Sequence, residues 1–177
     1  RAARHDALTA TPRGAAPGTF LHELMEWAAK TGFGAAVRDT DARRKAVAAR
    51  CESAGWADWT EVLDAWLPAF LSGEFALPDG ARWRLCELAR YKAELEFWIE
   101  ARAVNTVVLD RLVCAGTLAG APRPALQAQA LNGMLKGFID LVFEWQGRYY
   151  VADYKSNWLG ADAAAYTAGA MRDTVLA

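Results

Sequence analysis

Two carboxylates and one amine in the second half of the chain have the types and spacing for chemistry at a metal ion. Asp140 and Asp153 are separated by twelve residues, and Lys155 follows two positions after Asp153. Two carboxylates that face each other repel unless a cation lies between them. Hard oxygen ligands favour Mg²⁺, with Mn²⁺ as a substitute. If the fold brings these residues together, they predict a metal site.

A β-hairpin is the element that would bring them together. Apolar, β-branched and aromatic residues fill 134–144 and 148–155 on both sides of Gln146-Gly147. A two-residue turn would place Asp140 across from Asp153, with β-carbons about 4.5–5.5 Å apart, and Lys155 on the same face. A three-residue loop with a bulge would shift the pairing by one position. An ordinary surface ion pair is the other interpretation of Asp-X-Lys.

Three separated segments resemble one enzyme family, the RecB-type nuclease domains of the PD-(D/E)XK superfamily. They are residues 12–22, 133–143 and 147–160, and the last two contain the Asp…Asp-X-Lys pattern. The resemblance implies a Mg²⁺-dependent deoxyribonuclease of the exodeoxyribonuclease V type. A metal-activated water would hydrolyse the phosphodiester, while Lys155 positions that water or stabilises the added negative charge.

The resemblance also implies further site residues. In this family a metal-binding histidine lies where the chain has Gly18-Thr19-Phe20-Leu21-His22, and the Tyr154 backbone carbonyl is a possible further ligand. A glutamate shortly before a phenylalanine on the first sheet strand helps to hold the metal or its water. Glu94 matches that position better than Glu96, with solvent-facing strand residues as the alternative for either.

The family implies a larger assembly around this domain. RecBCD-type enzymes unwind duplex DNA ends with ATP for recombinational repair and feed single strands to the nuclease, beside RecC-like and RecD-like partners. No phosphate-binding loop of the Gly-X-X-X-X-Gly-Lys-Ser/Thr type occurs here, so ATP would bind elsewhere in a longer protein. The alternatives are a docking or DNA-binding domain that has lost catalysis, and a stand-alone structure-specific endonuclease of the same fold.

Composition fits one domain with a sizeable core. The 177 residues are 54% hydrophobic and include eight Trp, without an apolar run long enough for a membrane helix. Three cysteines favour reduced thiols and a cytoplasmic location. A net charge of −1 gives no global basic signature, so any DNA path would need local cations. The candidates are Arg82, Arg84, Arg90, Lys92 and Lys136. For each of them a solvated surface charge is the alternative interpretation.

The predicted fold is α/β, a small mixed sheet with the hairpin 134–155 at its centre and helices flanking it. Residues 1–18 are expected to be a connector and 19–177 the nuclease domain. The chain begins with Arg and lacks the family's Gln-X-X-X-Tyr element, so we expect a C-terminally truncated piece, weak or inactive alone. Periodicity and capping signals predict helices over 19–30, 39–54, 57–71, 104–113 and from about 162, and a strand over 91–100.

Overall fold

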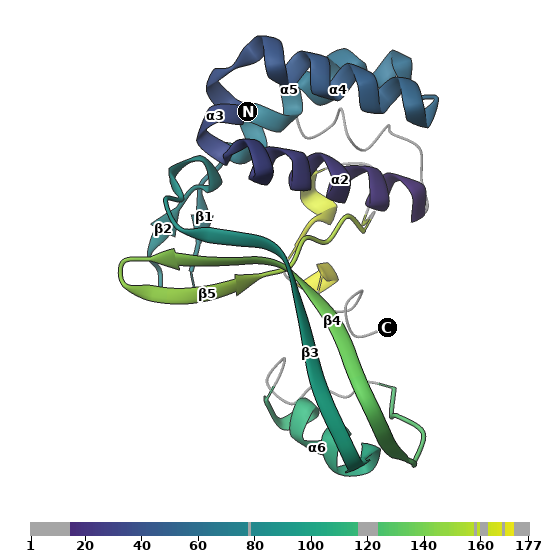
Figure 1. Cartoon of the computed structure of the whole chain (residues 1–177). Helices are drawn as coiled ribbons and strands as arrows, with labels where there is room; N and C mark the ends of the chain where they lie inside the picture. Colours follow the sequence, from purple (N-terminus) through teal and green to yellow (C-terminus); the bar gives the residue numbers. More distant parts are fainter. Residues whose placement is uncertain are drawn as a thin grey trace. The chain divides into compact units, whose positions relative to one another are not determined.

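A computed structural model describes residues 15–77, 79–116, 124–157, 159, 163–167 and 169–171. Helices come first in the chain, and long antiparallel strands follow (Figure 1). The predicted α/β class, with a small sheet built on a central antiparallel hairpin, is confirmed. The elements are α2 (Ala15–Thr31), α3 (Phe33–Arg38), α4 (Thr40–Ala54), η2 (Ala57–Trp59), α5 (Thr60–Leu71), β1 (Phe75–Ala76), β2 (Arg82–Trp83), η3 (Leu85–Glu87), β3 (Tyr91–Asn105), α6 (Thr106–Gly116), β4 (Ala130–Trp145), β5 (Arg148–Ala152) and η5 (Ala163–Ala165).

The chain divides into two compact units. Unit 1 consists of Arg1–Leu95 and Ile139–Trp158, and unit 2 of Glu96–Phe138 and Leu159–Ala177. Strands β3 and β4 therefore contribute residues to both units. The connector assigned to residues 1–18 stays a prediction, because 1–14 lie outside the described residues.

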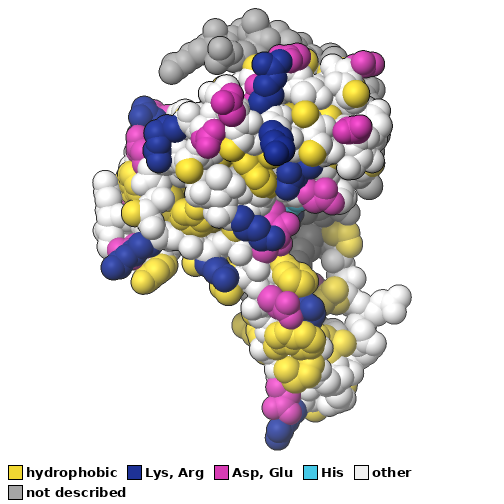
Figure 2. Space-filling model, turned by 45° about the horizontal axis from the view of Figure 1, so that its top comes forward, with side chains coloured by type: hydrophobic (Ala, Val, Ile, Leu, Met, Phe, Trp, Pro, Cys, Tyr) yellow, Lys and Arg dark blue, Asp and Glu magenta, His cyan; other side chains and the backbone are white. Residues whose placement is uncertain are grey.

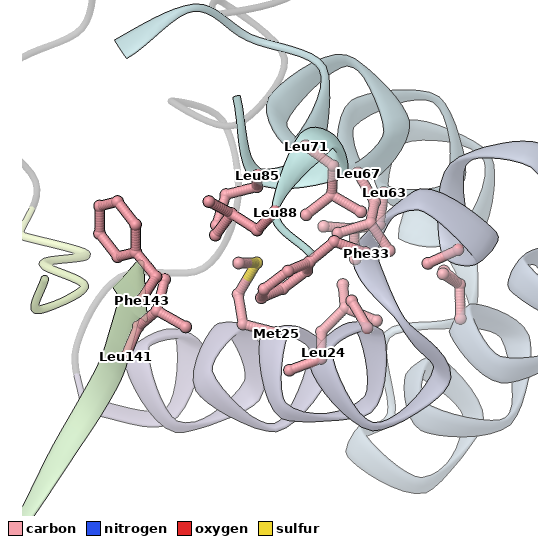
Figure 3. Packing of buried hydrophobic residues seen from close by; sticks show 14 of the residues in the cluster. Leu24, Met25, Phe33, Leu63, Leu67, Leu71, Leu85, Leu88, Leu141 and Phe143 are labelled. Carbon is pink, nitrogen blue, oxygen red and sulfur yellow. The ribbon is translucent and has the colours of Figure 1, made fainter. Parts of the chain in front are cut away.

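Unit 1 contains a continuous hydrophobic core between its helices and the end of β4 (Figure 3). Full burial of one Leu or Phe side chain contributes about 1.5–3 kcal/mol, so this cluster accounts for much of the stability of the unit. The members labelled in Figure 3 come from α2, α3, α5, the η3 region and β4: Leu24, Met25, Phe33, Leu63, Leu67, Leu71, Leu85, Leu88, Leu141 and Phe143. Helix α4 adds Val47 and Cys51 to the cluster.

Helix α2 begins at Ala15, so the predicted start at Thr19 is wrong. Pro17 falls in the first turn, where a missing backbone N–H breaks no helical hydrogen bond. Phe20, Leu24 and Ala28 form an apolar stripe at four-residue spacing, and all three are buried. As a result, His22 lies in the second turn of the helix, not the first, on a half-buried position beside that stripe.

The next two helices follow their capping signals closely. Asp39 caps α4 by accepting a hydrogen bond from the Ala42 amide, and Gly55 ends it in the left-handed conformation with a φ of 72°. The predicted helix over 57–71 divides into the 3₁₀ turn η2 and helix α5. Pro68 does not shorten α5, which continues to Leu71.

The hairpin has the predicted register. Leu141 pairs with Ala152 and Trp145 with Arg148, so the loop has two residues and no bulge. Gln146 and Gly147 both have positive φ, 51° and 76°, as a type I′ turn requires. Within the three-stranded sheet the order is β3-β4-β5, which makes β4 the central strand.

Strand β3 is five residues longer than the predicted 91–100, because it continues through Asn105. The helix predicted from Val104 therefore starts two residues late, as α6. Asn105 explains the boundary, since its side-chain oxygen accepts hydrogen bonds from the Val107 and Val108 amides like an N-cap. Of the helix predicted from about 162, the described residues show the 3₁₀ turn Ala163–Ala165 and helical backbone at 169–171.

No helix in the described part of the chain has the length and apolar content needed to span a bilayer.

Candidate metal centre

Three side chains of the types that bind divalent metals converge in unit 1. His22 comes from α2, Glu94 from β3 and Asp140 from β4, and one potential ligand atom of each lies within 4.8 Å of the others. All three side chains are half-buried. Among the described His, Cys, Asp and Glu residues, this is the one group of at least three with such geometry.

The histidine ring is oriented by the main chain of Tyr154. Its Nε2 lies 3.1 Å from the Tyr154 carbonyl oxygen, which can only accept, so Nε2 carries the hydrogen of this bond. In the neutral ring Nδ1 then has a lone pair, and it lies 3.9 Å from Oδ2 of Asp140. Two electron-pair donors facing each other across this gap suit a cation between them. This donor set fits a divalent metal ion.

The main chain of Tyr154 also orients Asp140. Its Oδ2 accepts a hydrogen bond from the Tyr154 amide over 2.7 Å, and its side chain is 13% exposed. The Tyr154 peptide groups therefore orient both His22 and Asp140, one through the N–H and the other through the carbonyl. The sequence predicted only the carbonyl as functional. The amide contact follows from the end of β5 at Ala152, which leaves the Tyr154 N–H outside the ladder.

Glu94 occupies a conformation that strands rarely contain. Its φ is 49°, in the left-handed region, which costs a non-glycine residue on the order of 1–3 kcal/mol. The predicted strict alternation of β3 is interrupted there, because Ala93, Glu94 and Leu95 are all half-buried. The altered backbone sends Glu94 toward His22 and Asp140. Glu96, the rejected alternative, pairs instead with Lys136 in unit 2 at 3.1 Å.

Burial and neighbouring charge raise the pKa of Glu94 above its ordinary value. Burial has the largest effect, followed by the negative charges of Asp140 and Glu26, while His22 and Lys30 oppose the shift. The local excess of negative charge is what a bound cation would neutralise.

Asp153 and Lys155 lie outside this three-residue group. The ladder between β4 and β5 ends with Leu141 and Ala152, one pair before Asp140 and Asp153. Beyond it, Oδ2 of Asp153 lies 2.5 Å from Nζ of Lys155, and both side chains are about half exposed, at 53% and 44%. The predicted pairing of Asp140 with Asp153 therefore stays a prediction. In the structure Lys155 neutralises Asp153, and Asp140 accepts a hydrogen bond from the Tyr154 amide.

Helix α2 lies close to residues 154–156, which follow β5, and this proximity allows His22 to contact the Tyr154 carbonyl. A β-carbon on Gly18 would lie 3.0 Å from Oγ of Ser156. Gly18 is one helical turn before His22, so both residues are on the same side of α2 and face residues 154–156. A glycine four residues before a candidate ligand on a helix is a signal that could have been read from the sequence.

Most of the proposed basic residues are engaged by acids. Arg82 pairs with Glu74, Arg84 with Glu87 and Arg90 with Glu144, at 3.1, 3.0 and 2.9 Å. Figure 2 shows Lys and Arg side chains interspersed with Asp and Glu over the face in view. Lys92 is exposed, and no ion pair with another described residue is found for it. Surface charge therefore gives no continuous basic stripe on this face.

Comparison with known proteins identifies the family of the chain. The sequence profile of the PD-(D/E)XK nuclease superfamily matches residues 1–168. The chain is 39% identical to the RecBCD enzyme subunit RecB of Escherichia coli over 161 residues, 90% of this chain and 13% of that protein. It is 32% identical to RecB of Buchnera aphidicola from Acyrthosiphon pisum over 110 residues, 62% of this chain and 9% of that protein.

RecB of Haemophilus influenzae shares 46% identity over 55 residues, 31% of this chain and 4% of that protein. The chain thus spans about an eighth of the E. coli relative. With a family match over nearly its whole length, the chain belongs to the PD-(D/E)XK nuclease superfamily, whose members use divalent metals.

Proposed function

We propose that this chain is the nuclease module of a RecB-type subunit and hydrolyses DNA phosphodiester bonds with Mg²⁺. The observation that carries the proposal is the convergence of His22, Glu94 and Asp140 in a chain of this superfamily. Mn²⁺ would substitute, because the carboxylate and carbonyl oxygens of the site suit both ions.

His22, Glu94 and Asp140 would hold the metal, with the Tyr154 carbonyl as a further proposed ligand. When bound, the ion would lower the pKa of a water molecule and neutralise negative charge on the phosphate. The main chain of Tyr154 keeps the imidazole and one carboxylate in place before substrate arrives. Such preorganisation removes reorganisation from the reaction itself.

Asp153 and Lys155 are proposed as the catalytic acid and amine beside this group. Their mutual ion pair is largely exposed, so it is weak and can be exchanged for contacts with a metal or phosphate at little cost. Lys155 would then stabilise negative charge on the phosphate, or position the attacking water. Release of Lys155 from Asp153 would also free that carboxylate for the metal.

The relatives suggest the setting of this activity. Their name identifies RecB as a subunit of the RecBCD enzyme, and we propose that this domain receives single strands from unwound duplex ends in a comparable assembly. RecC-like and RecD-like subunits would be its partners, ATP would act in a separate motor region, and the role would be processing of double-strand ends in the cytoplasm.

A DNA degradation assay tests the proposal. The full-length subunit, in its complex, is given linear DNA with Mg²⁺, with Mn²⁺ and with EDTA, and ATP-driven unwinding is measured in parallel. Asp153→Ala and Lys155→Ala should each abolish cleavage and preserve unwinding. Degradation in EDTA, or near wild-type cleavage by either variant, would contradict the proposed chemistry.

A further inference from the structure

We propose that Trp98, Lys136 and Phe138 of unit 2 form a subsite on which bases of single-stranded DNA stack. The inference rests on the proposed nuclease function, since it assigns a place for the substrate strand outside the metal centre. Trp98 belongs to β3, and the other two residues belong to β4.

The two rings are exposed to solvent with an amine between them. Trp98 is 56% exposed and Phe138 is 55% exposed, which is unusual for side chains of this size. The Nζ atom of Lys136 lies 5.0 Å from the centroid of the Trp98 ring and 4.9 Å from that of Phe138. The strands therefore present two aromatic surfaces and one cation together.

The carboxylate of Glu96 contacts both the Trp98 indole and the Lys136 amine. Oε1 of Glu96 accepts a hydrogen bond from Nε1 of Trp98 over 2.6 Å and pairs with Nζ of Lys136 at 3.1 Å. Long side chains normally lose rotamer entropy when they bind a ligand, and contacts that hold them beforehand reduce this loss. The indole and the amine are thus preorganised at the surface.

The chemistry of the cluster favours an unpaired nucleic acid strand. Every base has a π-face, and stacking on an aromatic side chain needs no particular sequence. In a duplex those faces are already occupied by neighbouring bases, so the exposed rings suit single strands. Glu96 balances the charge of Lys136, which makes stacking the main source of affinity here. In the sequence, Phe138 precedes the candidate metal ligand Asp140 by two residues.

The test measures affinity of the 177-residue chain for fluorescein-labelled oligothymidylate by anisotropy, in EDTA so that cleavage does not interfere. Trp98→Ala and Phe138→Ala should each weaken binding roughly 5- to 150-fold, the range for loss of one stacked base. Ile99→Ala is the matched control, since Ile99 is 55% exposed on the same strand and has no ring. It should leave affinity unchanged.

Glu96→Gln is the diagnostic variant. The amide oxygen can still accept from Trp98 Nε1, but the charge that neutralises Lys136 is lost. Binding should become tighter and more dependent on salt, because the amine can then contact phosphate. A surface that binds a protein through its apolar rings would not acquire a steeper salt dependence for DNA.

Several outcomes would overturn the inference. Unmeasurable binding by the wild-type chain would do so, as would equal affinities of wild type, Trp98→Ala and Phe138→Ala. Self-association of wild type that Trp98→Ala abolishes, with DNA affinity unchanged, would show an interface between copies instead. The proposed function fails separately: a chain and complex that bind DNA through this cluster but never cleave it with Mg²⁺ would refute the nuclease and leave the subsite standing.

Discussion

The amide of Tyr154 donates a hydrogen bond to Oδ2 of Asp140 over 2.7 Å, while the carbonyl of the same residue accepts one from His22. Residue 154 thus orients two candidate ligands through backbone atoms that every residue except proline possesses. Its side chain contributes differently, because the ring packs against the core and its hydroxyl is buried without a partner among the described residues.

Removal of that hydroxyl should therefore be harmless. A buried hydroxyl without a hydrogen bond costs about 1–3 kcal/mol, so Tyr154→Phe should leave the free energy of unfolding unchanged or raise it by up to that amount. The variant should also keep the rise in melting temperature that Mg²⁺ produces in wild type. Denaturant unfolding and thermal melts with and without Mg²⁺ measure both effects. Clear destabilisation would reveal a partner for the hydroxyl.

Glu94 should make the metal-free protein less stable as pH rises. Its pKa is raised in the folded state by burial and by Asp140 and Glu26. The folded protein therefore holds this proton more tightly than the unfolded chain does. The stabilisation is fully present below the ordinary pKa of Glu and is lost as pH rises through the raised value.

The matched comparison is Glu94→Gln, which cannot titrate. In EDTA the variant should equal wild type in unfolding free energy at low pH and exceed it increasingly as pH rises through that window. Other carboxylates contribute equally to both proteins, so the difference isolates Glu94. A difference that is constant with pH would show that the Glu94 charge is not penalised in the fold.

The sequence predicts the features of this site that neighbouring residues determine better than those that depend on residues distant in sequence. The two-residue turn at Gln146-Gly147 and the resulting register are local properties, and both were predicted correctly. The ladder of β4 and β5 stops at Leu141 and Ala152, one pair before Asp140 and Asp153, so the predicted pairing of these two acids stays a prediction. Local patterns do not encode where a ladder stops, because the end depends on contacts such as the hydrogen bond from the Tyr154 amide to Asp140.

Glu94 illustrates the same point on the other strand. Alternation alone placed Glu94 and Glu96 on one face and could not separate them. A positive φ at Glu94 separates them in the structure, and periodicity does not predict such a conformation. Family resemblance favoured Glu94 because it contains information about tertiary structure that periodicity lacks.

An ion pair between Arg43 and Asp64 connects α4 with α5 in unit 1. It should contribute more to the free energy of unfolding than the neighbouring surface pair of Arg44 and Glu61. Arg43 bonds to Asp64 at 2.9 Å and to the Ala36 and Val37 carbonyls, with the two paired side chains only 8% and 14% exposed. Loss of one partner leaves a buried charge and unpaired carbonyls. Arg43→Leu should therefore destabilise the chain by about 3–5 kcal/mol.

Arg44→Leu is the control for this change. Arg44 pairs with Glu61, but both side chains are more than half exposed, at 58% and 73%. An exposed pair contributes about 0–1 kcal/mol. Urea unfolding of the two variants compares them directly. Similar losses would mean that the Arg43 contacts contribute no more than an ordinary surface pair.

Asp140→Asn should have opposite effects with and without metal. In EDTA the Asn side-chain oxygen can still accept from the Tyr154 amide, and the repulsion between residue 140 and Glu94 disappears. Stability should stay the same or rise by roughly 0.2–1 kcal/mol, the range for an opposed like-charge pair. With Mg²⁺ present, the loss of a charged ligand should remove most of the metal-induced stabilisation, which for a site at a hundredfold its Kd is about 2.7 kcal/mol.

Two further Asp→Asn variants make this measurement decisive. Asp79→Asn changes an acid that pairs with Arg148 on the surface, away from the three-residue group, and should keep the full Mg²⁺ shift. Asp153→Asn tests whether that residue leaves Lys155 to join the metal, in which case part of the shift is lost. Thermal melts of all four proteins in EDTA and in Mg²⁺ give the comparison. If Asp140→Asn melts far below wild type in EDTA, or retains the whole Mg²⁺ shift, Asp140 is a structural acid and the metal centre proposed here is incorrect.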